Sequence, residues 1–173
     1  MTYKECITKE MNELAKNPLA IFIGQQVADQ DFYGTLKEIP LDRRIEMPVA
    51  EEMQMGMCIG MALEGLLPVS IYQRMDFLPR AMDQLVNHLN ILHKLSRKKF
   101  CPKVIIRTTI GSKEPLDTGL QHSKDMVRGF QAMLDFPVLD LKTKEDIVKG
   151  YQLAREGCDS IMLVERQDLY TTG

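Results

Sequence analysis

Short apolar runs recur along the chain, and segments with helical spacing separate most of them. The run 19–23 is wholly apolar and stops at Gly24, which is typical of a strand buried on both faces of a parallel sheet. Because such strands alternate with helices, the connections are expected to be right-handed crossovers. The sequence therefore predicts an α/β fold of three layers, a mostly parallel sheet with helices on both faces. The further strands are expected at 45–47, 67–72, 103–108, 138–141 and 160–165.

The predicted helices fill the intervals between these strands. We expect Asp76 to cap the third helix and either Ser123 or Asp125 to open the fourth, while Thr143 and Asp146 form a capping box on the fifth. No linker, repeat or low-complexity tract interrupts the pattern, so residues 1–173 are expected to form a single domain. The expected helices span 2–16, 50–64, 76–95, 123–134 and 143–156, and 25–44 and 109–122 are expected to be loops, the first with room for one helical turn.

The amino-acid composition limits the classes of molecule that the chain is expected to bind. The 22 basic and 24 acidic residues nearly cancel, so the chain has no overall field that would attract nucleic acid or an anionic membrane. No apolar run approaches the roughly 20 residues that span a bilayer, and the first residues lack the character of a signal or transit peptide. The cysteines are far apart and form no metal-binding pairs, which favours free thiols in a reducing cytoplasm. They are Cys6, Cys58, Cys101 and Cys158.

The usual nucleotide signatures are missing. Neither GxGxxG nor GxxxxGK[ST] occurs, which argues against a nucleotide-binding Rossmann domain. Ligands on parallel sheets bind beyond the carboxyl ends of the strands, so the loops that follow residues 23, 47, 72 and 108 are the places to expect a site.

The segment 48–62 is the most informative. Glu51 opens its helix, where an acid can simply interact with the helix dipole. Gly56 and Gly60 share one face of the helix. Each lowers helix stability by about 1 kcal/mol relative to alanine. We expect close packing against another helix, at a subunit interface, to offset this loss. A stripe of methionines lies beside them, for which core packing is favoured over a cofactor contact. These are Met53, Met57 and Met61.

Several blocks, in order and at consistent spacing, resemble one family. They are TYKECI (2–7), IFIG (21–24), EMPVAE (46–51), GMA with GLLPV (60–69), DF with AMDQLVN (76–87), QHS (121–123) and LY (169–170). Together they make residues 2–170 similar to the pyrimidine-binding domain of thiamine-diphosphate enzymes. The best match is the N-terminal half of the beta subunit of 2-oxoacid dehydrogenases, of the pyruvate and branched-chain types, which are related to transketolase.

The resemblance implies roles for individual residues. Glu51 matches the glutamate that hydrogen-bonds N1′ of the cofactor's aminopyrimidine and relays a proton there, whereas Glu52 should face elsewhere, about 100° around the helix. Phe77 matches the aromatic that stacks on the pyrimidine ring, a role favoured over a plain core position, and Gln73 falls in the lining of the same pocket. His122 matches a histidine that assists acyl transfer at the reactive end of the cofactor, although an ordinary loop histidine is an equal alternative.

The chain also departs from the family pattern. Gln25 and Gln26 replace acids that help to link paired active sites, and neither the diphosphate-binding domain with its magnesium motif nor the C-terminal transketolase domain is present. The resemblance therefore implies a homo- or hetero-oligomer in which a diphosphate-binding alpha-type subunit holds most of the Mg²⁺ contacts. This chain would supply the aminopyrimidine half of the site for decarboxylation of, or acyl or ketol transfer from, a small 2-oxo acid.

Two alternatives remain open. The chain would be inactive alone, and it could be a catalytically silent assembly or regulatory domain that has kept the fold. It could also be the N-terminal piece of a longer beta subunit. Glu51 argues against the silent domain, whereas the missing second half of the site argues for it.

Overall fold

The computed structural model describes residues 1–112, 117 and 119–170. Its described part contains a six-stranded sheet in the order β2-β1-β3-β4-β6-β5, and every strand pairing is parallel. The strands are β1 (Ala20–Gly24), β2 (Arg44–Glu46), β3 (Leu67–Tyr72), β4 (Ile105–Ile110), β5 (Val138–Leu141) and β6 (Ile161–Arg166).

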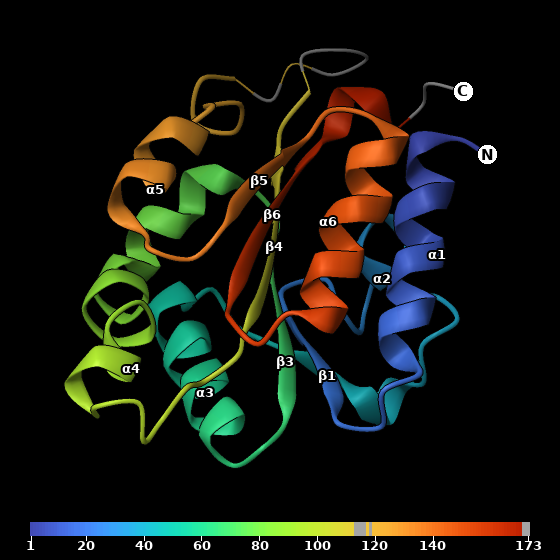
Figure 1. Cartoon of the computed structure of the whole chain (residues 1–173). Coiled ribbons are helices and arrows are strands. Elements are labelled where there is room, and N and C mark those ends of the chain that lie inside the picture. Colours follow the sequence, from blue (N-terminus) through green and yellow to red (C-terminus); the bar gives the residue numbers. More distant parts are fainter. Residues whose placement is uncertain (113–116, 118, 171–173) are drawn as a thin grey trace.

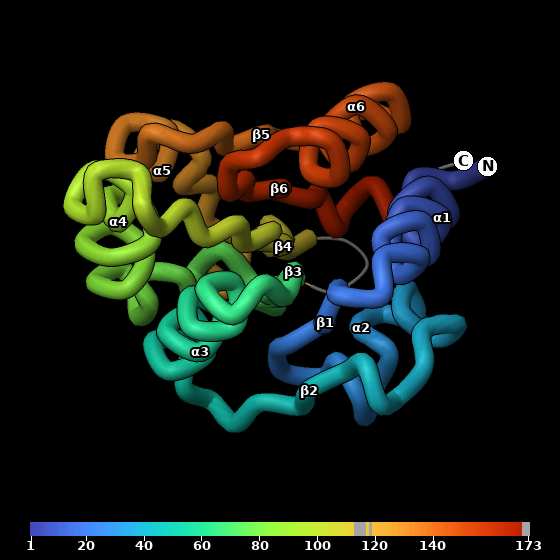
Figure 2. The backbone as a smooth tube through the Cα atoms, turned by 60° about the horizontal axis from the view of Figure 1, so that its bottom comes forward, coloured from blue at the N-terminus to red at the C-terminus, as the bar shows by residue number. Residues whose placement is uncertain are grey.

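Helices cover both faces of the sheet, which confirms the predicted three-layer α/β fold (Figures 1 and 2). One face carries α1 (Tyr3–Ala15), α6 (Lys144–Glu156) and the short α2 (Asp31–Gly34). The other carries α3 (Glu51–Leu63), the 3₁₀ helix η2 (Met75–Ala81), the π-helix η3 (Asp83–Leu89), α4 (Leu92–Leu95) and α5 (Val127–Met133). Two further 3₁₀ turns are η1 (Leu41–Arg43) and η4 (Gln167–Leu169). Within these described segments, no helix has the length and apolar character needed to cross a membrane.

Helices α1 and α6 begin at side-chain caps. In α6 the Thr143 hydroxyl accepts from the Asp146 amide while the Asp146 carboxylate accepts from the Thr143 amide, which is the predicted capping box. Thr2 and Glu5 form the same arrangement at the start of α1. Such caps contribute about 1 kcal/mol each and fix where the helices begin.

Several predicted boundaries are wrong, and each error has a local cause. Residues 76–95 do not form one helix, because Pro79 lies inside η2 and the chain then continues as η3 and α4. Asp76 caps nothing there, since its Oδ1 accepts instead from the Lys124 amide at 3.3 Å. Helix α5 begins only at Val127, whose amide donates to Asp125 Oδ1 at 3.1 Å. Strand β4 begins two residues later than predicted, at Ile105.

The methionine stripe of α3 does not pack into the core as predicted. Met53 and Met57 are 49% and 39% exposed, and only Met61 lies partly against the core. The helix instead turns Gln54 toward the sheet, where its amide donates to Ile23 O, Ser70 Oγ and Ile71 O. A buried amide needs such partners, so Gln54 sets the rotation of α3 and moves the two methionines to the surface.

A buried ion pair crosses the centre of the sheet. Arg107 on β4 and Glu165 on β6 are both fully buried, with Arg107 Nε 2.6 Å from Glu165 Oε1. Tyr151 and Tyr170 donate their hydroxyls to the same carboxylate, and burial raises the pKa of both phenols. The charges are thus paired and hydrogen-bonded, as buried ions must be. The four cysteines are free thiols, as predicted.

Candidate functional site

The carboxyl ends of the parallel strands share one edge of the sheet, and the predicted site residues gather there. Glu51 begins α3 after β2, Gln73 and Phe77 follow β3, and His122 lies in the segment after β4. This is the edge at which parallel sheets bind ligands.

Glu51 is buried despite its charge. Its carboxylate is 3% exposed and accepts a hydrogen bond at Oε2 from Arg80 Nε, 3.0 Å away, while Arg80 itself is 68% exposed. The second oxygen, Oε1, receives no hydrogen bond from any residue that the structure describes. The neighbouring Glu52 is exposed, which confirms that the two side chains point in different directions. Glu51 is therefore an acid held in place by one displaceable counter-ion.

An open depression of about 930 Å³ lies over Glu51. The first two turns of α3 form one side of it, and Arg80 and Gln84 form the other. Gln84 comes within 3.6 Å of the point that a Cβ atom on Gly56 would occupy. A planar ligand in this depression could therefore reach the buried carboxylate.

Phe77 and His122 lie against each other, although 45 positions separate them in the sequence. Their ring centroids are 5.6 Å apart at an interplanar angle of 90°, an edge-to-face contact. Both side chains are half-buried, and His122 Nδ1 is buried without a hydrogen-bond partner in the described part of the chain. Phe77 and Arg80 are three residues apart on η2, and in a 3₁₀ helix such residues lie on one side. Helix η2 thus carries one member of each pair: Arg80 of the Glu51–Arg80 pair and Phe77 of the Phe77–His122 pair.

Gln73 is held through its backbone. Its carbonyl accepts from Arg74 Nη1 at 2.8 Å and from Thr109 Oγ1 at 2.5 Å, and the side chain is half-buried. A contact between the Gln73 side chain and a cofactor stays a prediction.

The glycine pair of α3 also stays a prediction. Within the described chain, only the Gln84 side chain approaches Gly56, and nothing lies within 4 Å of a Cβ built on Gly60. The expected close helix neighbour is therefore not among the residues that the structure describes, and packing at a subunit interface stays a prediction.

Two arginines of the site were not predicted from the sequence. Arg80 could have been found from its spacing, because it follows Phe77 by three residues. Arg74 directly follows Gln73 after β3, and only the structure shows that it is buried.

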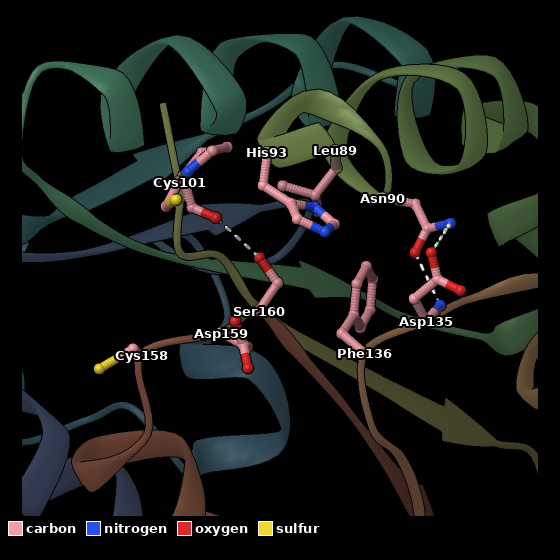
Figure 3. A pocket seen from close by; sticks show the side chains of 10 residues that line it. Leu89, Asn90, His93, Cys101, Asp135, Phe136, Cys158, Asp159 and Ser160 are labelled. Atoms are coloured by element: carbon pink, nitrogen blue, oxygen red, sulfur yellow. Dashed lines mark hydrogen bonds between the residues drawn. The ribbon is translucent and has the colours of Figure 1, made fainter. Parts of the chain in front are cut away.

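A separate small cavity lies at the opposite, amino ends of β4 and β6. It measures about 140 Å³ and is bordered by His93, Cys101 and Cys158 (Figure 3). Ser160 Oγ donates to Pro102 O at 3.1 Å in its wall. None of the predicted site residues lines it, so it is distinct from the site around Glu51. Among the residues that the structure describes, no three His, Cys, Asp or Glu side chains are placed to hold a metal ion.

The family match and the relatives found by comparison with known proteins agree with each other. Residues 1–172 match the family described as "Transketolase, pyrimidine binding domain". The chain is 30% identical over 132 residues to the pyruvate dehydrogenase E1 component subunit beta of Staurastrum punctulatum, covering 70% of this chain and 38% of the relative. It is 25% identical over 176 residues to the mitochondrial subunit beta of Saccharomyces cerevisiae, covering 98% of this chain and 48% of the relative. The chain thus spans less than half the length of these relatives.

Solved structures agree on the fold. A split-gene transketolase, described as an inactive beta4 tetramer, superposes with a TM-score of 0.72 at 17% identity, covering 96% of this chain and 51% of that one. Transketolase from Campylobacter jejuni superposes with a TM-score of 0.75 at 17% identity, covering 95% of this chain and 25% of that one. The family match over nearly the whole length, together with this fold, shows that the chain belongs to the transketolase pyrimidine-binding domain family, with pyruvate dehydrogenase E1 beta subunits among its relatives.

Proposed function

We propose that this chain supplies the aminopyrimidine half of a thiamine-diphosphate site in a two-subunit enzyme that acts on a 2-oxo acid. The observation that carries the proposal is Glu51, a buried carboxylate facing an open depression with a single exposed counter-ion. The family match and the pyruvate dehydrogenase relatives support the choice of cofactor and reaction class.

The chemistry of the residues suits an aminopyrimidine. A carboxylate can alternate between accepting and donating a proton, and Oε1 of Glu51 accepts no hydrogen bond from a described residue, whereas Arg80 occupies Oε2. A ring nitrogen can bind at that oxygen or displace Arg80, whose side chain is mostly in solvent. Burial then removes competing water from the proton transfer between Glu51 and the ring nitrogen.

Phe77 and His122 complete the proposed half-site. The half-buried Phe77 ring presents an apolar face on which a planar heterocycle can stack. His122 is oriented by its edge-to-face contact with Phe77, and its Nδ1 has no hydrogen-bond partner among the described residues, so we assign it the transfer of a proton to or from the substrate. Thiamine diphosphate, when bound, supplies the carbanion chemistry that cleaves or transfers the carbon chain of the 2-oxo acid.

A partner subunit is part of the proposal. We infer that an alpha-type chain binds the diphosphate and holds most of the Mg²⁺ contacts, and that this chain joins it through α3, where Gly56, Gly60 and the exposed Met53 and Met57 lie on the surface. The split-gene transketolase, whose beta chains alone form an inactive tetramer, supports this division of labour. The missing diphosphate and C-terminal domains would belong to other chains or to a longer form of this one.

The test is co-expression with a candidate diphosphate-binding subunit, followed by an assay for decarboxylation of 2-oxo acids. Activity that requires both chains, the cofactor and Glu51 supports the proposal. The competing function, a catalytically silent assembly domain, predicts a stable complex whose properties do not change when the Glu51 carboxylate is removed.

A further inference from the structure

Buried arginines in this chain have carboxylate partners, with one exception. Three arginines are at least nine-tenths buried: Arg44, Arg74 and Arg107. Arg44 pairs with Asp31, and Arg107 pairs with Glu165. Arg74 has no carboxylate partner among the residues that the structure describes. A buried cation without a counter-ion is costly, so its place in the fold needs a reason.

The contacts of Arg74 hold its guanidinium still without neutralising it. Nη1 donates to Gln73 O at 2.8 Å, to Thr109 Oγ1 at 3.2 Å and to the Tyr33 hydroxyl, and the group lies 5.5 Å from the centre of the Tyr33 ring. All of these acceptors are neutral. Nε, on the other edge of the guanidinium, is buried and has no hydrogen-bond partner among the residues that the structure describes. A buried donor left unpaired destabilises the fold, because it loses its hydrogen bonds with water.

Gly111 brings this unpaired edge next to the His122 segment. A Cβ atom on Gly111 would lie 3.0 Å from Arg74 Nε and 1.9 Å from the His122 carbonyl oxygen, so no side chain could fit between them. His122 Nδ1 is also buried and unpartnered, and its ring contacts Phe77. Two residues with unpaired nitrogens therefore border the same glycine, at the edge of the sheet that carries the proposed cofactor site.

We infer that Arg74 recognises an oxyanion of the substrate, either a carboxylate or a phosphate, and that Nε donates to it beside His122. A guanidinium forms strong, directional hydrogen bonds with both kinds of oxyanion, and a bound anion would supply the missing counter-charge. The hydrogen bonds of Nη1 hold the guanidinium in a fixed orientation before an anion binds. This inference rests on the proposed function, because it assigns the anionic end of that same substrate, and it makes Arg74 a determinant of specificity.

The inference can be tested on the folded chain without cofactor or partner. The Arg Nε–H signals of the ¹⁵N-labelled chain are followed by NMR at constant ionic strength while pyruvate, inorganic phosphate or the uncharged ester methyl pyruvate is added. The Arg74 signal, identified by its loss in Arg74→Lys, should shift saturably with at least one of the two anions and not with the ester. Arg128 is exposed and serves as the internal control for general ionic effects. A response at lower concentrations of pyruvate identifies a carboxylate, and a response at lower concentrations of phosphate identifies a phosphate.

Two variants test the separate roles of Arg74 Nε and of the Tyr33 hydroxyl. Arg74→Lys keeps the charge but loses Nε, and it should bind the anion about tenfold more weakly, as measured from the backbone amide signal of Gly111 in the native chain and in the variant. Tyr33→Phe removes only the hydroxyl that anchors Nη1 and should still bind. The inference is overturned if neither anion shifts the Arg74 signal saturably, if Arg128 responds equally, or if Arg74→Lys binds as well as the native chain. Should Arg74→Lys fail to fold, triple-resonance assignment of the native chain identifies the Arg74 Nε–H signal, and the titration of the native chain then decides.

The proposed function and this inference can fail independently of each other. If removing the Glu51 carboxylate abolishes activity in the reconstituted complex while Arg74 ignores both anions, the function stands and this inference falls. If Arg74 binds an anion saturably while the complex keeps full activity after loss of the Glu51 carboxylate, anion recognition stands and the proposed function falls.

Discussion

Arg80 Nε donates a 3.0 Å hydrogen bond to Glu51 Oε2, joining an acid that is 3% exposed to a base that is 68% exposed. The pair is asymmetric: the acid is fixed by the fold of α3, and the base can move into solvent. Glu51 is thus held in place while the depression above it is open, and its partner can leave without disturbing the core.

Arg80→Gln should therefore destabilise the chain modestly, by about 1 kcal/mol, because Glu51 loses a charged hydrogen bond whose donor is largely screened by water. The free energy of unfolding in urea measures this loss. Arg128→Gln, at an exposed position, is the control. In a double-mutant cycle with Glu51→Gln, a coupling energy of zero would show that the pair does not contribute to stability.

The α3 surface makes a prediction about assembly. Gly60→Leu adds a large side chain at a point with no neighbour within 4 Å inside the described chain, so the fold should be unaffected. Association with a second subunit should weaken, because the bulk would hold the facing helix away. Sedimentation velocity measures the shift toward smaller species, and an unchanged distribution would count against α3 as the interface. Leu153→Ala, on the exposed side of α6, is a suitable control.

The isolated chain should bind thiamine diphosphate weakly or not at all. Most of the charge of the cofactor is on its diphosphate, which binds through Mg²⁺ in such sites, and the described residues offer no cluster of metal ligands. Titration calorimetry with and without Mg²⁺ measures the affinity. Tight, Mg²⁺-dependent binding by this chain alone would mean that the diphosphate half of the site is not on a partner.

The buried pair at the centre of the sheet should dominate stability. Glu165→Gln leaves Arg107 buried without a counter-ion and should cost about 3–5 kcal/mol of unfolding free energy. Glu13→Gln removes a surface pair with Lys16 and should cost less than about 1 kcal/mol. Denaturant unfolding of both variants gives the comparison, and similar losses would contradict a structural role for the Arg107–Glu165 pair.

Local patterns predicted much of the fold. Strands β3 and β5 occupy the predicted residues, and the Thr143–Asp146 capping box forms as expected, because alternating apolar runs and caps depend on neighbours in the sequence. The predicted helix over 76–95 is wrong because Pro79 breaks an otherwise helical pattern. The exposure of the methionines was not predictable, because three long-range hydrogen bonds of Gln54 set the rotation of α3.

The site was predictable in part, from the family resemblance. The resemblance pointed to Glu51, Phe77 and His122, and the structure brings Phe77 and His122 into contact and buries Glu51 beside the same helix η2. The spacing from Phe77 could point to Arg80, but its ion pair with Glu51 and the burial of Arg74 were not predictable, because both depend on residues distant in sequence.

The most direct test of the account replaces Glu51 in a reconstituted complex. Glu51→Gln keeps the size of the side chain but cannot relay a proton, so turnover should fall by about 10²–10⁴-fold with little change in folding. Glu52→Gln, whose side chain is exposed, is the matched control and should remain near normal. His122→Ala should spare exchange of the cofactor's C2 proton and slow the later substrate steps, and equal loss of exchange in both variants would contradict this division of roles. Near-normal turnover in Glu51→Gln, or equal losses in Glu51→Gln and Glu52→Gln, would contradict the central claim and favour a silent assembly domain.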